Sequence, residues 1–386
     1  MSLRIGIVAA EPSGDLLGAG LMRGLLARDP GIRFEGIGGE LMSAAGLASW
    51  VPMERLSVMG LVEVLRHLPA LLRLRREIKE RWLASPPDLF IGVDAPDFNL
   101  GLERDLRAAT IKTVHYVSPT VWAWRPGRVK QLRQAVDLLL GIFPFEVEFL
   151  ERHGVPVRYV GHPLAAEMPL EPDRAAARQA LGLPEDAPVL ALLPGSRCSE
   201  VEALSGPFLE AARRCVEAMP GLEIVVPLAN QRTRAAFERL QAAHAPELAV
   251  RVQQGGSRTV LVAADVVLTA SGTATLEALL AKRPMVVGYK VHWLTYLLAK
   301  QLKLVKVEHV AMANLLAAQR LAPEFIQHEC TAKLLADALL AFFTEPQRVA
   351  AVQARYREIH EAMRRDTNEQ AASAVLELLQ EGTGAG

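Results

Sequence analysis

Short runs of aliphatic residues alternate along this chain with longer segments in which apolar residues recur every three or four positions. The short runs are bounded by Gly, Pro, Asp or Ser, as buried strands of a parallel sheet are, and the longer segments are typical of amphipathic helices. In the first half the predicted strands are 3–10, 34–36, 89–94, 112–117, 137–142 and 157–160. In the second half they are 189–193, 222–227, 250–252, 265–270 and 285–289. This alternation predicts an α/β fold with a doubly wound parallel sheet in each half.

A proline-rich stretch separates the two halves. Residues 162–188 contain five prolines and an Arg/Ala-rich helical segment, and a new buried strand follows at once. We therefore expect an N-terminal Rossmann-like domain over 1–165 and a C-terminal Rossmann-like domain over 186–345. The remaining residues, 346–386, have the pattern of helices, which we expect to pack back on the N-terminal domain.

Composition fits this fold class and excludes several functions. The 386 residues are 51% hydrophobic, enough for two cores, and their formal net charge of zero gives no bulk attraction to nucleic acid. Three isolated cysteines without CxxC spacing argue against a disulfide framework or a zinc site, and they favour a reducing cytoplasm. No uncharged run approaches the ~18 residues that span a bilayer, and the apolar N-terminal run is too short for a secretory signal. We expect a soluble or peripheral protein.

The most informative segment is 265–284, where a buried strand leads into a turn of small residues and then a helix. The turn residues are Ser271, Gly272, Thr273 and Ala274. Ser271 is the expected N-cap, and the free amides of the first helical turn suit a phosphate. Glu277 follows Thr273 at i+4, about 6 Å along the helix axis, where its carboxylate could accept hydrogen bonds from a ribose. The alternative is an ordinary strand-turn-helix with a solvated glutamate, and this segment alone leaves both open.

A second strand end in the same half carries an arginine. Strand 189–193 runs into a Pro-Gly turn followed by Ser196 and Arg197. A guanidinium at this position could hold a diphosphate through two parallel hydrogen bonds. Together with the segment 265–284, this turn favours a nucleotide-diphosphate site in the second domain.

Carboxylates mark a strand end in the first half. Strand 89–93 delivers Asp94 at its carboxyl end, and Asp97 and Asn99 follow closely. Either aspartate is a candidate general base, because desolvation at a strand end facing a cleft raises the pKa of a carboxyl group. The alternative is that one aspartate caps a helix and the other forms a turn.

Two further turns of the first half, together with Asp97 and Asn99, complete the candidates for the acceptor or lipid side. The first strand ends in a tight turn with Ser13 and Asp15, which could expose amides at the next helix start. Neither this turn nor the glycines that follow complete the GxGxxG spacing, so NAD binding is disfavoured. Strand 112–117 runs into a loop with Ser118 and Trp122, where indole faces could contact sugar rings or acyl chains or simply pack.

Two amphipathic segments, 56–82 and 293–310, interleave leucines with arginines and lysines. Basic faces beside exposed aliphatic residues suit an anionic membrane interface. The alternative for each segment is a core helix with a solvated basic face. The sequence therefore leaves peripheral membrane contact open.

The whole chain resembles the lipid-A-disaccharide synthase family. The motifs that carry the resemblance are GVDAPDFN (92–99), HYVSPTVWAWR (115–125), LPGSR (193–197) and ASGTA (270–274). The resemblance implies a GT-B architecture of two Rossmann-like domains facing a cleft. It also implies transfer of 2,3-diacylglucosamine from its UDP conjugate to the 6-hydroxyl of 2,3-diacylglucosamine 1-phosphate, with release of UDP.

By position, the family's essential aspartate and arginine match Asp94 and Arg197. The family often has a proline where this chain has Ala313, before Asn314, the residue that would contact the nucleotide. The resemblance further implies a cytoplasmic enzyme, peripheral on the inner membrane. It leaves the oligomeric state open, with a homodimer as one option.

These residues suggest an inverting displacement in which Asp94 removes the proton of the acceptor hydroxyl, with Asp97 as the rival base. Arg197, Ser196 and the amides of 271–274 would stabilise the leaving diphosphate, so we expect neither a metal nor another cofactor. A UDP-sugar epimerase or another GT-B transferase would share the nucleotide site. A two-lobed solute receptor would share the cleft without catalysis.

Overall fold

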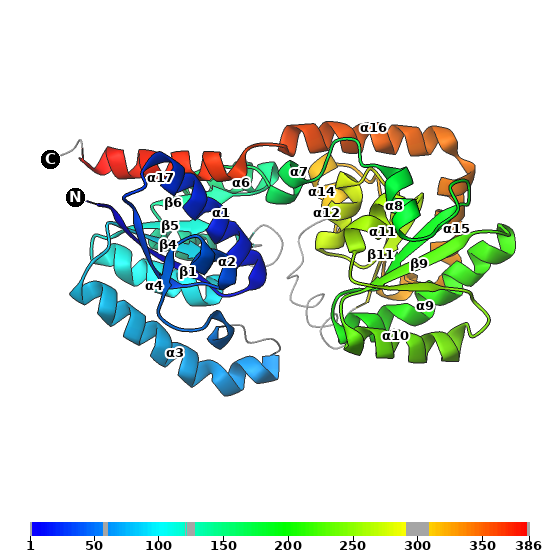
Figure 1. The fold of residues 1–386 in the computed structure, drawn as a ribbon, viewed down its shortest axis with the longest axis horizontal. Helices are drawn as coiled ribbons and strands as arrows, with labels where there is room; N and C mark the ends of the chain where they lie inside the picture. The colour runs from blue at the N-terminus through cyan, green and yellow to red at the C-terminus, as the bar shows by residue number, and fades with distance from the viewer. Residues whose placement is uncertain (1, 57–60, 120, 122–127, 291–308, 384–386) are drawn as a thin grey trace. The chain divides into compact units, whose positions relative to one another are not determined.

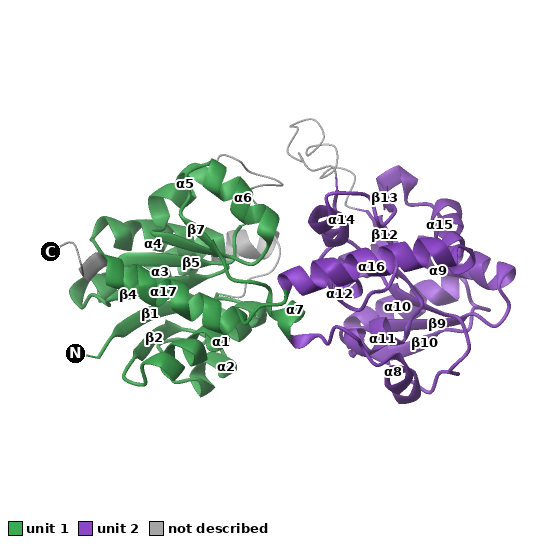
Figure 2. Ribbon diagram, turned by 90° about the horizontal axis from the view of Figure 1, so that it is seen from above, with its two compact units in different colours: residues 1–166, 364–386 green, residues 167–363 purple. Residues whose placement is uncertain are grey.

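The computed structural model describes residues 2–383 except 57–60, 120, 122–127 and 291–308, and of 61–67 and 382–383 it describes the backbone alone. The chain divides into two compact units. Unit 1 comprises Met1–Ala166 and Arg364–Gly386, and unit 2 comprises Glu167–Met363 (Figure 2).

Unit 1 is built on a seven-stranded sheet in the order β3-β2-β1-β4-β5-β6-β7, with every neighbouring pair parallel. The strands are β1 (Arg4–Ala9), β2 (Arg33–Ile37), β3 (Leu47–Ser49), β4 (Leu89–Val93), β5 (Lys112–Tyr116), β6 (Leu138–Gly141) and β7 (Val157–Tyr159). The helices are α1 (Pro12–Arg28), α2 (Glu40–Ala44), α3 (Leu61–Ala84), α4 (Pro96–Ala108), α5 (Arg128–Ala135), α6 (Pro144–Arg152), α7 (Pro163–Glu167) at the unit boundary, and α17 (Thr367–Thr383).

Unit 2 is built on a six-stranded parallel sheet in the order β10-β9-β8-β11-β12-β13. The strands are β8 (Val189–Leu193), β9 (Glu223–Leu228), β10 (Arg251–Gln254), β11 (Val266–Thr269), β12 (Met285–Tyr289) and β13 (Glu324–Ile326). The helices are α8 (Arg174–Ala180), α9 (Cys198–Ala218), α10 (Gln231–His244), α11 (Ser257–Ala263), α12 (Thr273–Leu280), α14 (Met312–Ala317), α15 (Ala332–Thr344) and α16 (Pro346–Met363).

Helices cover both faces of each sheet, which is why the central strands are apolar throughout (Figure 1). All five residues of β4 and all five of β8 are buried. The predicted α/β class with two parallel-sheet domains is confirmed. The sequence reading missed β3 and β13, which are three residues long, lie at sheet edges and are only partly buried.

The C-terminal segment 346–386 is divided between the units. Helix α16 packs against α12, α14 and α15 of unit 2, whereas α17 lies along α1 of unit 1 (Figure 1). Two glycines of α1 permit this close packing. A methyl group on Gly20 would lie 2.2 Å from Oδ1 of Asn368, and a methyl group on Gly24 would lie 2.7 Å from the carbonyl oxygen of Asn368. Residues of α17 therefore belong to the core of unit 1.

Candidate functional site

In unit 1, Asp94 follows directly on β4 in a left-handed backbone conformation. Its φ is 52°, that of Ala95 is 45°, and that of Val117, which follows the neighbouring strand β5, is 79°. L-residues rarely adopt such angles, least of all a β-branched valine, and each costs on the order of 1–3 kcal/mol. These three strained residues lie at the carboxyl edge of β4 and β5, the edge at which open α/β sheets bind ligands.

Two hydrogen bonds hold the Asp94 backbone in this conformation. Its amide donates to the carbonyl of Tyr116 over 2.8 Å, and its carbonyl accepts from Nδ2 of Asn99 over 2.8 Å. Asn99 is fully buried, so this contact is shielded from water. The Asp94 side chain itself is only partly buried. Its carboxylate can therefore meet a ligand while its backbone stays fixed.

The second carboxylate of the motif has different surroundings. The Asp97 side chain is 84% exposed and forms an ion pair with Arg128 of α5. It lies in the first turn of α4, where a negative charge interacts favourably with the positive end of the helix dipole. These surroundings fit a surface role for Asp97.

Asp15 has a structural function that the sequence reading missed. Its Oδ1 accepts from the amides of Gly39 and Met42 over 2.8 and 3.0 Å, and its Oδ2 accepts from the amide of Leu41 over 3.0 Å. The carboxylate therefore caps α2, 24 to 27 residues along the chain. Ser13 is exposed in the first turn of α1.

The loop after β5 is described in part. Ser118 is buried, and its hydroxyl donates to the carbonyl of Pro119 over 3.0 Å. Trp122 lies outside the described residues. The expected contact of this loop with a sugar or an acyl chain stays a prediction.

In unit 2, Glu200 closes the turn that carries Arg197. Its Oε2 accepts from the amides of Ser196 and Arg197 over 3.0 and 3.3 Å, and its Oε1 lies 3.8 Å from the Arg197 guanidinium. Gly195 has a φ of 123°, and a methyl group there would lie 2.4 Å from Cβ of Glu200. The Arg197 side chain is 69% exposed and available to a ligand.

The turn before α12 differs in one respect from the sequence reading. Gly272, with a φ of 127°, is the N-cap, so the prediction of Ser271 as N-cap was wrong. The Ser271 hydroxyl instead donates to the carbonyl of Val310 over 3.0 Å. No side chain caps α12, and Gly272 and Thr273 are exposed. Amides of the first turn, at Thr273 and Ala274, are therefore accessible to an anion.

The start of α14 lies beside the start of α12. Thr275 Oγ1 accepts from the amide of Met312 over 2.9 Å and donates to the carbonyl of Gly272 over 2.7 Å. Glu324 fixes the chain just before α14, because its Oε1 accepts from the amides of Val310 and Ala311 over 3.1 and 2.8 Å. The sequence-based prediction missed these contacts, of which the one between Thr275 and Met312 joins residues 37 positions apart.

Asn314 is fully occupied within the fold. Its Nδ2 donates to the carbonyl of Ala322 and to Oε1 of Glu324 over 2.8 and 2.9 Å. Its Oδ1 accepts from the amides of Leu321 and Ala322, both over 2.8 Å. Two donors and two acceptor positions are all that a side-chain amide has. Asn314 therefore has no polar group left for a nucleotide, and its contacts identify it as a structural residue.

Glu277 lies one turn beyond Thr273 on α12 and is partly buried. Burial raises the pKa of its carboxyl group above the ordinary value, and the positive charge of Arg258 opposes this shift. A partly desolvated carboxylate of this kind makes stronger hydrogen bonds with hydroxyl donors than one in bulk water.

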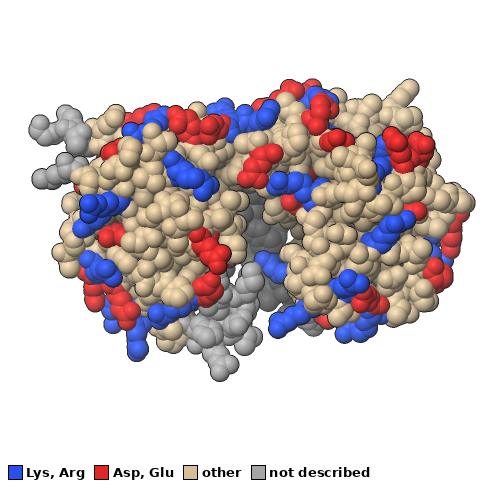
Figure 3. Space-filling view, in the orientation of Figure 1, with Lys and Arg blue, Asp and Glu red and all other residues tan. Residues whose placement is uncertain are grey.

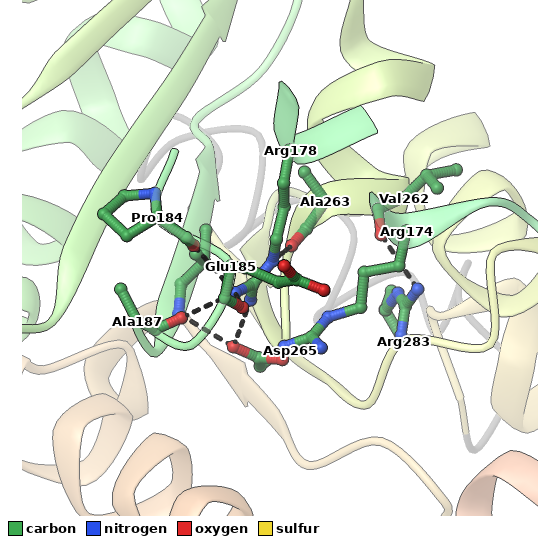
Figure 4. A network of polar contacts seen from close by, with 10 residues as sticks. Arg174, Arg178, Pro184, Glu185, Ala187, Val262, Ala263, Asp265 and Arg283 are labelled. Atoms are coloured by element: carbon green, nitrogen blue, oxygen red, sulfur yellow. Dashed lines mark hydrogen bonds and ion pairs between the residues drawn. The ribbon is translucent and has the colours of Figure 1, made fainter. Parts of the chain in front are cut away.

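A buried arginine, Arg178, stabilises the amino ends of β8 and β11, opposite the carboxyl ends that lead into the Arg197 turn and the α12 turn (Figure 4). Arg178 of α8 donates to Oδ2 of Asp265 over 2.8 Å and to the carbonyls of Ala263 and Ala187 over 3.0 and 2.8 Å. The amide of Val189, the first residue of β8, also donates to Asp265 Oδ2, over 2.9 Å. These contacts lie at the amino ends of β8 and β11. They therefore stabilise the sheet and lie away from its carboxyl edge, where ligands bind in such sheets.

Charges of both signs are interspersed on the visible face of each unit (Figure 3). The uniform basic surface that nucleic-acid binding requires is not seen on that face. Within the described residues, no helix is both long and apolar enough to cross a membrane.

The comparisons with known proteins agree in one family. A family model described as lipid-A-disaccharide synthetase matches residues 5–378. The chain is 51% identical to lipid-A-disaccharide synthase of Xylella fastidiosa (strain M12) and 52% identical to that of Pseudomonas aeruginosa (strain LESB58), with 98% of both chains covered in each case.

Two solved structures show the fold at low sequence identity. UDP-GlcNAc 2-epimerase from Neisseria meningitidis has a TM-score of 0.62 and 11% identity, covering 99% of this chain and all of that one. Sucrose-phosphate synthase from Thermosynechococcus elongatus has a TM-score of 0.61 and 14% identity, with both chains covered completely. Taken with the family model and the relatives, these likenesses lead to one conclusion: the chain belongs to the lipid-A-disaccharide synthase family of GT-B glycosyltransferases, which act in lipid A biosynthesis.

Proposed function

We propose that the chain transfers 2,3-diacylglucosamine from its UDP conjugate to the 6-hydroxyl of 2,3-diacylglucosamine 1-phosphate. The products are the β-1,6-linked disaccharide 1-phosphate and UDP, and the anomeric configuration is inverted from α to β. The observation that carries this proposal is Asp94, a partly buried carboxylate on a strained turn at the ligand edge of a Rossmann-like sheet, in a chain of this family.

Unit 2 would bind the UDP of the donor. The uncapped first turn of α12 offers backbone N–H groups to a phosphate, and the Arg197 guanidinium projects from the turn after β8. Strands β8 and β11 are neighbours in the sheet, so both turns lie at the same edge. Glu277, one helical turn farther along, would accept hydrogen bonds from the ribose.

Unit 1 would activate the acceptor. Asp94 takes the proton of the 6-hydroxyl as the oxygen forms its bond to the anomeric carbon from the face opposite UDP. The bond from that carbon to the diphosphate breaks in the same step, and its electron pair leaves with UDP. Arg197 and the α12 amides offset the negative charge that develops on the diphosphate.

Product analysis tests the reaction. The chain is incubated with the acylated UDP-sugar and the acylated sugar 1-phosphate, and the products are identified by mass spectrometry and by the anomeric coupling constant in NMR spectra. We expect one β-linked disaccharide 1-phosphate and one equivalent of UDP. An α-linkage would contradict inversion, and binding without turnover would favour a receptor. Turnover of de-acylated UDP-glucosamine alone would favour an epimerase or a different transferase.

A pair of isosteric substitutions tests the base. We expect Asp94→Asn to lower kcat by about 10³-fold, since general-base catalysis contributes typically 10²–10⁴-fold. Asp97→Asn is the matched control, because it removes the other carboxylate of the same motif and should leave kcat within about threefold. The reverse ranking would move the base to Asp97.

We further propose that α3 contacts the cytoplasmic face of the inner membrane, from which acylated substrates would enter. Over 68–84, one face of α3 packs inward and the other is exposed. The inward residues are Leu74, Ile78 and Trp82. Leu68 and Leu72 are 41% and 46% exposed, and Arg73 and Arg76 are exposed with them. Exposed leucines flanked by arginines suit an anionic interface. The second basic segment, 293–310, lies almost wholly outside the described residues.

Sedimentation with anionic liposomes tests this contact. We expect binding that weakens at high salt and that falls at least fivefold in Leu72→Glu. Leu334→Glu is the control, because Leu334 is a similarly exposed leucine, 40%, on α15 of unit 2. Equal binding by both variants, or negligible binding of the unchanged protein at either salt concentration, would rule out α3 as the contact.

A further inference from the structure

A buried acid and a buried imidazole lie directly behind the Asp94 turn. Oε1 of Glu103, on α4, is 2.7 Å from Nδ1 of His115, on β5, and both side chains are fully buried. Burial raises the pKa of the Glu103 carboxyl group, and the His115 ring opposes that shift. Burying such a pair costs desolvation free energy, and the pair lies beside the strained turn of Asp94.

Three polar atoms in this region have no hydrogen-bond partner among the described residues. They are Oδ1 of Asn99, Oε2 of Glu103 and Nε2 of His115. Asn99 and Glu103 are four residues apart and share one face of α4. Both reach the same point of β4, because a methyl group on Gly92 would lie 2.1 Å from Oε1 of Glu103 and 2.9 Å from Cβ of Asn99. The missing side chain of Gly92 is what makes room for them.

The same residues adjoin both backbone anchors of Asp94. The Asp94 carbonyl is held by Asn99, one helical turn from Glu103. The Asp94 amide is held by Tyr116, which is next in the chain to His115. His115 is also the register partner of Gly92 across β4 and β5. Movement of the buried pair would therefore displace both anchors.

We propose that Glu103 and His115 are positioning residues, which hold Asp94 in its left-handed conformation through Asn99 and the β4–β5 pairing. Neither touches the substrate. The expected effect of the pair on turnover rests on the proposed role of Asp94 as the base. The expected effect on the backbone of the turn does not, because that backbone is measured separately.

The test compares Glu103→Gln, which keeps the shape of the side chain, with Thr113→Val. Thr113 is a buried residue of the same strand as His115, but it lies near the amino end of that strand, where its hydroxyl donates to the carbonyl of Ala135 and to Oδ2 of Asp137 over 2.8 and 3.3 Å. In Glu103→Gln we expect faster amide hydrogen exchange in 92–99, kcat lower by about 10- to 100-fold and the KM for the UDP donor within about threefold of the original. In Thr113→Val we expect a lower melting temperature with none of these changes. If Glu103→Gln does not fold, His115→Gln serves instead, because it keeps a polar group near the Nε2 position but loses the Nδ1 contact with Glu103; it should give the same pattern.

Combination with Asp94→Asn separates this inference from the proposed function. If the pair acts through Asp94, adding Glu103→Gln to Asp94→Asn lowers the residual rate no further. Unchanged exchange in 92–99, or equal losses of activity in Glu103→Gln and Thr113→Val, would overturn the positioning role and leave Asp94 as the base. Faster exchange in Glu103→Gln together with an active Asp94→Asn enzyme would keep the positioning role and refute the base.

Discussion

Nδ2 of Asn99 donates to the main-chain carbonyl of Asp94 over 2.8 Å, and this buried hydrogen bond joins α4 to the turn that ends β4. Asp94 and Ala95 both have positive φ, so the turn would relax toward ordinary angles if nothing held it. The proposed base therefore depends on an amide side chain that has no contact with the reaction.

Replacement of Asn99 should show this dependence. We expect Asn99→Ala to lower the free energy of unfolding by about 1–3 kcal/mol, because the Asp94 carbonyl loses its donor. We also expect kcat to fall by at least about tenfold, since small displacements of reacting groups are costly. Denaturant unfolding and steady-state kinetics measure the two effects. A loss of stability with unchanged kcat would show that the hydrogen bond serves the fold alone.

Glu200 offers a test of the nucleotide turn. Its carboxylate accepts from two amides of the turn and faces the Arg197 guanidinium. In Glu200→Ala the turn loses these contacts, so we expect the Kd for UDP to rise about tenfold in calorimetry. Glu202→Ala is the control on the same helix, because Glu202 is exposed and its ion pair, with Arg239 at 3.2 Å, lies away from the Arg197 turn. Equal affinities in the two variants would argue that Arg197 needs no support from Glu200.

Asp15 should prove structural. Its carboxylate caps α2, and loss of a capping side chain costs typically about 1 kcal/mol. We expect Asp15→Ala to lower the melting temperature by several degrees while kcat and the KM for the acceptor stay within about threefold. A large change in the acceptor KM of the folded variant would restore the sequence-based assignment of Asp15 to the acceptor side.

His162 should make stability depend on pH. Burial lowers its pKa from the ordinary 6.5 to about 4, and its Nδ1 accepts from the amide of Leu164 over 3.2 Å. Between these two values the unfolded chain binds the proton and the folded chain does not, so stability falls as the pH drops from 6.5 toward 4. In His162→Asn, which keeps an acceptor and does not titrate, this fall should be smaller. Urea unfolding at pH 5.0 and 7.5 measures the difference, and identical pH dependence in both proteins would contradict it.

The alternation of apolar runs and amphipathic segments was sufficient to predict two parallel α/β sheets and most of their strands. A strand covered by helices on both faces must be apolar along its whole length, so β4 and β8 are recognisable from composition alone. The turns after these strands were recognisable for a related reason, since ligand residues of such sheets follow the carboxyl ends of the strands.

Only the tertiary structure decided which polar atoms are free. Ser271 would be a good N-cap by its residue type, but its hydroxyl donates to the carbonyl of Val310, 39 residues away, and Gly272 is the N-cap. The side chain of Asn314 is of a type that often binds ligands. Yet its amide is fully occupied by Glu324 and by the backbone groups of Leu321 and Ala322, seven and eight positions farther along. Hydrogen-bond partners depend on where distant segments dock. The sequence by itself therefore determined the sheets and the turns at their edges, and the packing of distant segments determined which side chains in those turns remain available for chemistry.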